Sequence, residues 1–362
     1  MKKFFAPRLF TVLALSTMLL ASCEEDPIEP KPGYQVPTTY NFENVYYEGQ
    51  SDRLRMLEEI STYMKTATTP GTTLSAQKLK EMYGNVGNHF TFTSTRQLKD
   101  KTFAPDRETV ENMMDALAAA SASTTPGSNG VAGIVTSNDG TKKYLFDANG
   151  FEHIQLIEKG LMGSALYYQA TGVYLTEDKT GDNIDNTTVK PNEGTPMQHH
   201  WDEAFGYFGV PKDYPANKTG LKFWGRYADS REAKLQSGTK IMNAFLKGRA
   251  AINNKDMKAK NEAITTIRTE WERASAASAI SYLNQAKAGF ADDAIRNHTL
   301  SEGIAFINAL KYNPAKKITD AQIATIIDTL GTNLYNVTLA QINSARDQLS
   351  AIYGMDAMKD SL

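Results

Sequence analysis

The sequence predicts an all-α fold of helical bundles in two related halves, with one small β-hairpin. Three observations predict it. Apolar residues recur at intervals of three and four along most of the chain, as on the buried face of a helix. A polar stretch without periodicity, residues 177–198, separates the two halves. The hydrophobic content of 41% is that of a globular chain rather than a disordered one.

Residues 1–22 are typical of a lipoprotein signal peptide. Three cationic residues, Lys2, Lys3 and Arg8, precede an apolar stretch over residues 9–20. This stretch is shorter than the roughly 20 residues that a membrane-spanning helix needs. It ends in Leu20-Ala21-Ser22-Cys23, the small residues and cysteine of a lipobox. We therefore expect residues 1–22 to be removed.

Cys23 is the only cysteine in the chain, and we predict that it is lipidated and anchors the protein in a membrane. A single cysteine also excludes a disulfide framework. The signal peptide carries three positive charges away from a chain whose net charge is −2, so the mature protein is acidic. No basic patch points to nucleic acid as a partner.

Residues 23–39 are predicted to be a Pro-rich spacer that separates the anchor from the globular part. The acidic cluster Glu24-Glu25-Asp26 directly after Cys23 resembles an export signal for lipoproteins of the outer leaflet. The alternative is a solvated linker. The expected location is the outer membrane, with the protein either exposed at the cell surface or facing the periplasm.

The first half, residues 40–176, is predicted to hold four helices and the hairpin. An apolar stripe runs from Leu54 to Met64, and further helices are expected over residues 75–83, 106–120 and 151–175, with Asp106 as an N-cap. Strands over 131–136 and 142–146 flank Asn138-Asp139-Gly140, a turn sequence suited to positive φ. Small residues such as Gly160 and Gly163 on the last helix indicate close helix packing.

The second half, residues 199–362, is predicted to be a helical bundle. Apolar periodicity places its helices near residues 199–208, 230–253, 257–289, 298–312, 320–330 and 338–353. Asp320 and Thr338 are the expected N-caps of the last two helices.

No established catalytic motif occurs in the chain. It has no Gly-x-Ser-x-Gly elbow, Walker loop, Rossmann glycine fingerprint or His-Glu-x-x-His zinc motif. Cysteine catalysis is excluded because the one cysteine is expected to be acylated. An enzyme is therefore the less favoured interpretation.

The densest run of polar chemistry begins at His199. On a helix, His199 and His200 each lie on the same face as Glu203, so either histidine could bind a metal ion together with Glu203 or form an acid–base pair with it. Trp201 and Asp202 complete the motif. A second run, His298 to Glu302, has the same spacing and suggests a degenerate internal repeat.

If the two helices pair, His199 or His200, Glu203, His298 and Glu302 would converge as nitrogen and oxygen ligands, a set that suits iron or zinc. The alternative is that each histidine is bonded within its own helix end and each glutamate pairs with a nearby cation. The aromatic residues around the motif are expected to be core.

The run from His199 to Gly209, with residues 159–163 before it, resembles an uncharacterised family of envelope lipoproteins, whose domain has no known function. More distantly, the chain is similar to the imelysins, helical envelope proteins of two related bundles associated with iron uptake. Their signature is Gly-x-His-x-x-Glu. His200 and Glu203 fill it, but Gln198 stands where the glycine should be.

Cys23 and the His199–Glu203 motif, together with the imelysin resemblance, favour a binding protein for iron, haem or another metal with an outer-membrane receptor as a partner. We expect it to be non-enzymatic, because the chain offers no complete catalytic set. One alternative is a metal-dependent peptidase with Glu203 as general base. Another is a protein-interaction module in which the motif is structural and an exposed loop, such as residues 121–130 or 212–220, contacts the partner.

Overall fold

The computed structural model describes residues 1–2 and 33–362. The chain divides into two compact units, Met1–Tyr34 and Gln35–Leu362. The signal peptide, Cys23 and most of the spacer lie outside the described residues, so these assignments stay predictions. The hydrophobic core runs from Tyr40 to Met355 and thus belongs entirely to the second unit. We therefore expect Gln35–Leu362 to fold by itself.

The all-α prediction is confirmed. The first part of the unit contains the α-helices α1 (Glu48–Lys65), α2 (Ala76–Tyr83), α3 (Arg107–Ser121) and α4 (His153–Leu161). A π-helix, η4 (Met162–Tyr174), continues α4 without a break. The later helices are α5 (Glu177–Thr180), α6 (Pro196–Gly206), α7 (Trp224–Ser230), α8 (Glu232–Leu235), α9 (Ser237–Asn253), α10 (Met257–Ala288), α11 (Asp293–Ala309), α12 (Asp320–Leu330) and α13 (Leu339–Tyr353). Short 3-10 helices lie between them, namely η1 (Thr66–Thr68), η2 (Lys99–Lys101), η3 (Ala104–Asp106), η5 (Leu310–Tyr312) and η6 (Leu334–Asn336), and η7 (Lys359–Ser361) follows α13.

The predicted hairpin is also confirmed. Strands β1 (Gly133–Thr136) and β2 (Lys143–Phe146) pair antiparallel, with Ile134 opposite Leu145. Gly140 has φ of +75°, a conformation that L side chains rarely adopt, and Asp139 accepts bonds from Ser137 and Thr141 across the turn.

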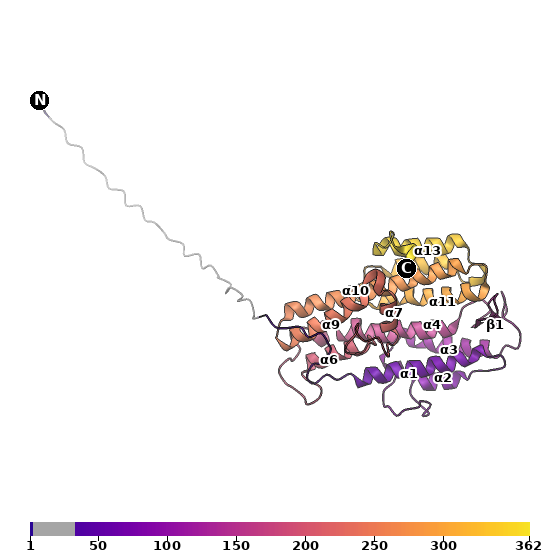
Figure 1. Ribbon diagram of the computed structural model, residues 1–362, viewed down its shortest axis with the longest axis horizontal. Coiled ribbons are helices and arrows are strands. Elements are labelled where there is room, and N and C mark those ends of the chain that lie inside the picture. The colour runs from indigo at the N-terminus through magenta and orange to yellow at the C-terminus, as the bar shows by residue number, and fades with distance from the viewer. Residues whose placement is uncertain (3–32) are drawn as a thin grey trace. The chain divides into compact units, whose positions relative to one another are not determined.

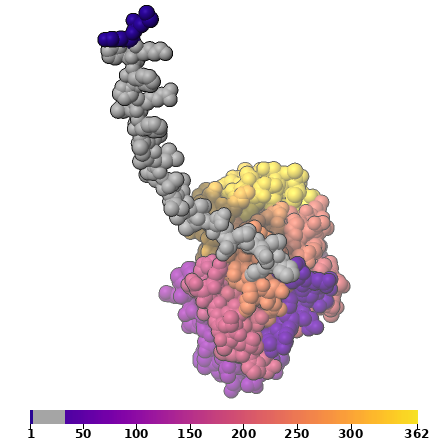
Figure 2. Space-filling model, turned by 90° about the vertical axis from the view of Figure 1, so that its left-hand side faces the viewer, coloured from indigo at the N-terminus to yellow at the C-terminus, as the bar shows by residue number. Residues whose placement is uncertain are grey.

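Two long helical segments organise the unit. Helix α10 packs against α9, α11 and α13, while the continuous helix formed by α4 and η4 contacts α1, α3, α6 and α11 (Figure 1). Helix α6 lies at one end of the unit and the hairpin at the other (Figure 1). Figure 2 shows the start of the unit, in indigo, packed directly against orange segments of the second half.

The helix boundaries differ from the predictions at several caps. Thr319, not Asp320, is the N-cap of α12, because Thr319 and Gln322 form a capping box. Thr338 caps α13 as predicted. Asp106 stands at the N-cap position of α3 but makes no capping bond, since its carboxylate accepts from Tyr312 and Lys311 instead.

Two predicted helices of the second half also have different extents. The helix expected over 230–253 is interrupted at Gln236, which has φ of +54° and separates α8 from α9. The helix expected over 298–312 begins earlier, at Asp293, because the Asp292 carboxylate accepts from two backbone N–H groups there. Helix α7 was not predicted. No helix within the described ranges is long and apolar enough to cross a bilayer.

Candidate functional site

Helix α6 positions the first His–Glu motif. Thr195 and Gln198 form a capping box at its start, and Pro196 occupies a first-turn position where no backbone N–H is needed. Gln198 therefore has a structural role at the position where the imelysin signature has glycine. Its side chain also donates to Asn253 of α9, at 2.8 Å.

One side of α6 is buried and structural. Trp201 is fully buried, and its Nε1 donates to the Phe245 carbonyl at 3.1 Å. Asp202 Oδ1 accepts from Tyr40 Oη at 2.7 Å and from Arg249 Nε at 2.9 Å. Burial raises the pKa of Asp202 to about 6, and the charge of Arg249 limits that rise. These two motif residues hold α6 against α9 and the Tyr40 segment.

The other side of α6 carries the chemically available groups. Glu203 Oε1 accepts from Gln50 Nε2 at 2.9 Å and from Tyr174 Oη at 3.0 Å. Its second oxygen, Oε2, lies 3.7 Å from His199 Nε2. The side chains of His199 and Glu203 are 25% and 18% exposed, so solvent reaches both. Glu203 thus has one oxygen held by two hydrogen bonds and a second oxygen that faces the His199 Nε2 atom.

His200 has a defined tautomer. Its Nδ1 lies 2.7 Å from the Lys179 carbonyl oxygen, which can only accept, so Nδ1 carries the proton and Nε2 a lone pair. Burial lowers the pKa of His200, which favours the neutral ring. His199 differs, because its Nδ1 is buried without a hydrogen-bond partner among the described residues. The Tyr46 ring stacks over His199 with centroids 5.9 Å apart.

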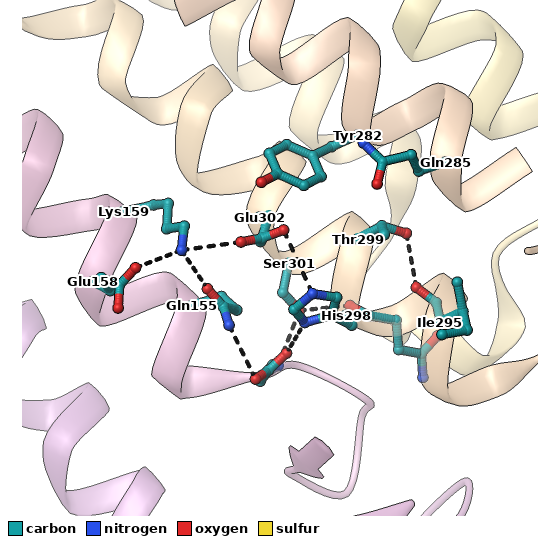
Figure 3. Close-up of polar contacts among 12 residues, drawn as sticks. Gln155, Glu158, Lys159, Tyr282, Gln285, Ile295, His298, Thr299, Ser301 and Glu302 are labelled. Carbon is teal, nitrogen blue, oxygen red and sulfur yellow. Dashed lines mark hydrogen bonds and ion pairs between the residues drawn. The ribbon is translucent and has the colours of Figure 1, made fainter. Parts of the chain in front are cut away.

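The second motif, on α11, has the same spacing but a different environment (Figure 3). His298 Nε2 lies 3.5 Å from Glu302 Oε2, and His298 Nδ1 donates to Glu152 Oε2 at 2.5 Å. Tyr144 of the hairpin stacks on the imidazole with centroids 4.0 Å apart. Burial acts to lower the pKa of His298, but its bond to Glu152 and the charges of both carboxylates raise it above the usual value.

A buried lysine completes this second cluster. Lys159 Nζ contacts Glu302 Oε1 at 3.0 Å, Glu158 Oε1 at 2.6 Å and Gln155 Oε1 at 2.7 Å. Burial opposes the charge of Lys159, but its interactions with neighbours, Glu302 and Glu158 among them, raise its pKa well above the usual value. Figure 3 shows Lys159 between the two carboxylates. The cluster is an ion-pair network with its cation already in place.

The predicted convergence of the two motifs is wrong. Glu203 contacts Tyr174 at the end of η4, whereas Glu302 contacts Lys159 of α4, so each motif meets a different part of one continuous helix. Helix α6 and the hairpin that covers His298 lie at opposite ends of the unit (Figure 1). Among residues 33–362, no group of three His, Cys, Asp or Glu side chains is arranged to hold a metal ion.

Sequence reasoning missed the partners of both motifs. Lys159 was noticed only as part of a motif, because α4 also carries Gln155 and Glu158 and its sequence does not show that this lysine is buried and needs counterions. Glu152 and Tyr144 carried no periodic signal that tied them to His298. The two remaining histidines are paired elsewhere: His153 with Asp147 at 3.1 Å and His89 with Glu81 at 2.6 Å.

Comparison with known proteins places the whole unit in one family. The family model described as "Domain of unknown function (DUF4856)" matches residues 37–356. No curated protein matches the chain. No solved structure matches it either.

Proposed function

The chain belongs to the family of the domain of unknown function DUF4856, and on that premise we propose that it is an envelope lipoprotein that binds a transition metal through His199 and Glu203. Iron and zinc are the ions whose ligand preferences suit one imidazole and one carboxylate. The role is capture of the ion, not catalysis.

One distance carries this proposal. His199 Nε2 and Glu203 Oε2 lie 3.7 Å apart on adjacent turns of α6. Zinc lies about 2.0–2.2 Å from nitrogen and oxygen ligands in a tetrahedral arrangement, so two of its ligands are roughly 3.4 Å apart, close to the separation seen here. A single ion can therefore contact both atoms with little movement of either side chain.

The surroundings of Glu203 and His200 support the same assignment. Metal ligands are held in orientation by hydrogen bonds from neighbouring groups. Gln50 and Tyr174 provide such bonds to Glu203 Oε1 and leave Oε2 available. The Lys179 carbonyl accepts the proton of His200 Nδ1 and so leaves Nε2 unprotonated, with a free lone pair that can bind metal. The ring centroids of His199 and His200 are 6.1 Å apart, so we propose His200 as an additional nitrogen ligand.

The second motif is a poor metal site for a specific reason. The Lys159 ammonium lies 3.0 Å from Glu302, where it neutralises that carboxylate. The carboxylates of Glu152 and Glu302 face both ring nitrogens of His298 and favour the protonated imidazolium, which has no lone pair to donate. We therefore assign binding to α6 and a structural role to the α11 cluster.

Two protein ligands leave most coordination positions to water or to a carrier molecule. Such a site exchanges its ion, as a capture protein must, and it suits iron that is hydrated or held by a small carrier. Glu203 is less suited to act as a general base, because two donors already hold one of its oxygens. The proposed location is the outer membrane, where Cys23 would be the lipid anchor and an outer-membrane receptor would accept the captured ion. The distant likeness to imelysins belongs to the same proposal.

A metal-loading assay tests this function. Residues 34–362 are dialysed to equilibrium against buffer that contains Fe(II) or Zn(II), and the metal bound in excess of the free concentration is assayed by elemental mass spectrometry. The expected result is close to one ion per chain, and little metal in a His199→Ala/His200→Ala/Glu203→Ala variant that retains the wild-type circular dichroism spectrum. Equal, substoichiometric metal in both proteins would overturn the proposal.

A further inference from the structure

A cavity of about 300 Å³ lies between α3, α4 and α11. None of the residues of the two His–Glu motifs lines it. The function proposed above does not use this cavity. Three features of its walls indicate that it is a binding site rather than a packing defect.

The first feature is a glycine with no packing reason. A Cβ added to Gly160 would have no atom within 4 Å, whereas one added to Gly163 would lie 2.9 Å from Ala309 Cβ. Close packing therefore explains Gly163, as the sequence predicts, but it does not explain Gly160, for which the prediction is wrong. Glycine destabilises a helix interior relative to alanine. Here its effect is to keep the cavity open along one side.

The second feature is an unpaired hydroxyl four residues further along the same helix face. Ser164 is 2% exposed and lines the cavity. Its Oγ accepts no hydrogen bond of good geometry from a described residue, since the neighbouring Tyr312 hydroxyl, which interacts with Ser164, donates to Asp106 instead. The backbone carbonyl of Ser164 accepts from Phe103 N–H. A buried hydroxyl without a partner is unfavourable unless a bound molecule supplies one.

The third feature is the distribution of apolar and charged groups. The inner wall is formed by buried Val110, Ile304 and Ala305, and the half-buried side chains of Met113 and Phe151 also line the cavity. These groups favour an apolar ligand body.

The charged groups of the cavity compensate each other. Lys311 Nζ pairs with Asp106 Oδ2 at 3.1 Å, and Tyr312 also donates to Asp106. No other charged side chain lines the cavity. A ligand with a net charge would therefore lose hydration without gaining a free counterion.

We propose that this cavity binds a small, neutral, largely apolar molecule with one polar group that hydrogen-bonds Ser164 Oγ. A molecule with one or two aromatic ring systems matches the volume and the apolar wall. This proposal is independent of metal binding at His199 and Glu203.

Fluorescence titration with N-phenyl-1-naphthylamine tests the proposal, because this probe is neutral, has two ring systems and carries one N–H donor. Residues 34–362 should bind it saturably at one site. Gly160→Leu, which fills the cavity from its open side, should weaken binding at least tenfold. Thr325→Leu, which adds the same side chain to the exposed surface of α12, should bind as wild type does.

Two further variants keep the test decisive. Ser164→Ala removes only the unpaired hydroxyl, so it should fold normally and bind the probe about threefold to tenfold more weakly. His199→Ala should leave probe binding unchanged, which separates this site from the proposed metal site. Absence of saturable binding to the wild type, or wild-type affinity in both Gly160→Leu and Ser164→Ala, would overturn the inference.

Discussion

Lys159 of α4 and Glu302 of α11 form an ion pair at 3.0 Å, with side chains only 6% and 7% exposed. The pair decides the chemistry of the second His–Glu motif, since the ammonium group already neutralises the carboxylate that a metal would need. On α6, no lysine or arginine of the described residues forms an ion pair with Glu203, since the neighbouring Lys101 donates to Tyr174 instead. Equal sequence spacing thus produces two different sites.

Removal of the Glu302 charge should destabilise the fold. Glu302→Gln leaves Lys159 buried with one fewer counterion, and breaking a buried pair typically costs about 3–5 kcal/mol. Urea unfolding measures the change. Glu262→Gln is the matched control, because its pair with Lys247 is about half exposed and its loss should leave the free energy of unfolding nearly unchanged. Similar losses in both variants would contradict the buried network.

Stability should depend on the protonation of His298. Its pKa is raised in the folded protein, so its stabilising contribution is complete below the unfolded pKa of about 6.5 and is lost as pH rises through the folded pKa. We expect the Tm of the wild type to fall as the pH is raised above about 6.5, and the Tm of His298→Gln to fall less over the same range. Differential scanning calorimetry across this range makes the comparison, and parallel curves for the two proteins would refute the assignment.

The two glycines of the α4–η4 helix should respond in opposite directions to alanine. Gly160→Ala meets no atom and should stabilise the protein by about 0.4–1 kcal/mol. Gly163→Ala would press on Ala309 and Tyr312 and should destabilise it by about 1–3 kcal/mol. Denaturant unfolding of both variants checks the difference, and equal effects would show that Gly160 is packed after all.

Cys23 should control attachment to the membrane. In cells, Cys23→Ser should abolish labelling by a radioactive or alkyne fatty acid and release the protein into the soluble fraction. The wild type should be labelled and sediment with the membranes. A labelled Cys23→Ser protein would place the lipid elsewhere.

Periodic apolar stripes predicted most of the fold, because helices that bury one face repeat at 3.6 residues. The stripe from Leu54 to Met64 became the buried face of α1, and the Asp-Gly turn became the hairpin. The capping boxes of Thr195 and Thr319 had a readable Thr-x-x-Gln signal that was overlooked. Gln236 in a left-handed conformation has no comparable signal, so the break before α9 could not be predicted.

The candidate site was predictable only within single helices. Spacing placed His199 beside Glu203 and His298 beside Glu302, and both pairs are present. Which helix lies opposite each pair depends on tertiary packing, and the α4–η4 helix supplies Lys159 to one and Tyr174 to the other. For that reason the convergence of four ligands was wrong, while the two pairs themselves were right.

The central claim is that the α6 pair, and not the α11 pair, binds metal. Titration of Zn(II) against a chromophoric chelator, with residues 34–362 as competitor, measures the affinity directly. Glu203→Gln should weaken binding at least tenfold, whereas Glu302→Gln, studied below its unfolding midpoint, should bind zinc as the wild type does. Wild-type affinity in Glu203→Gln, or a loss of binding in Glu302→Gln alone, would contradict the account.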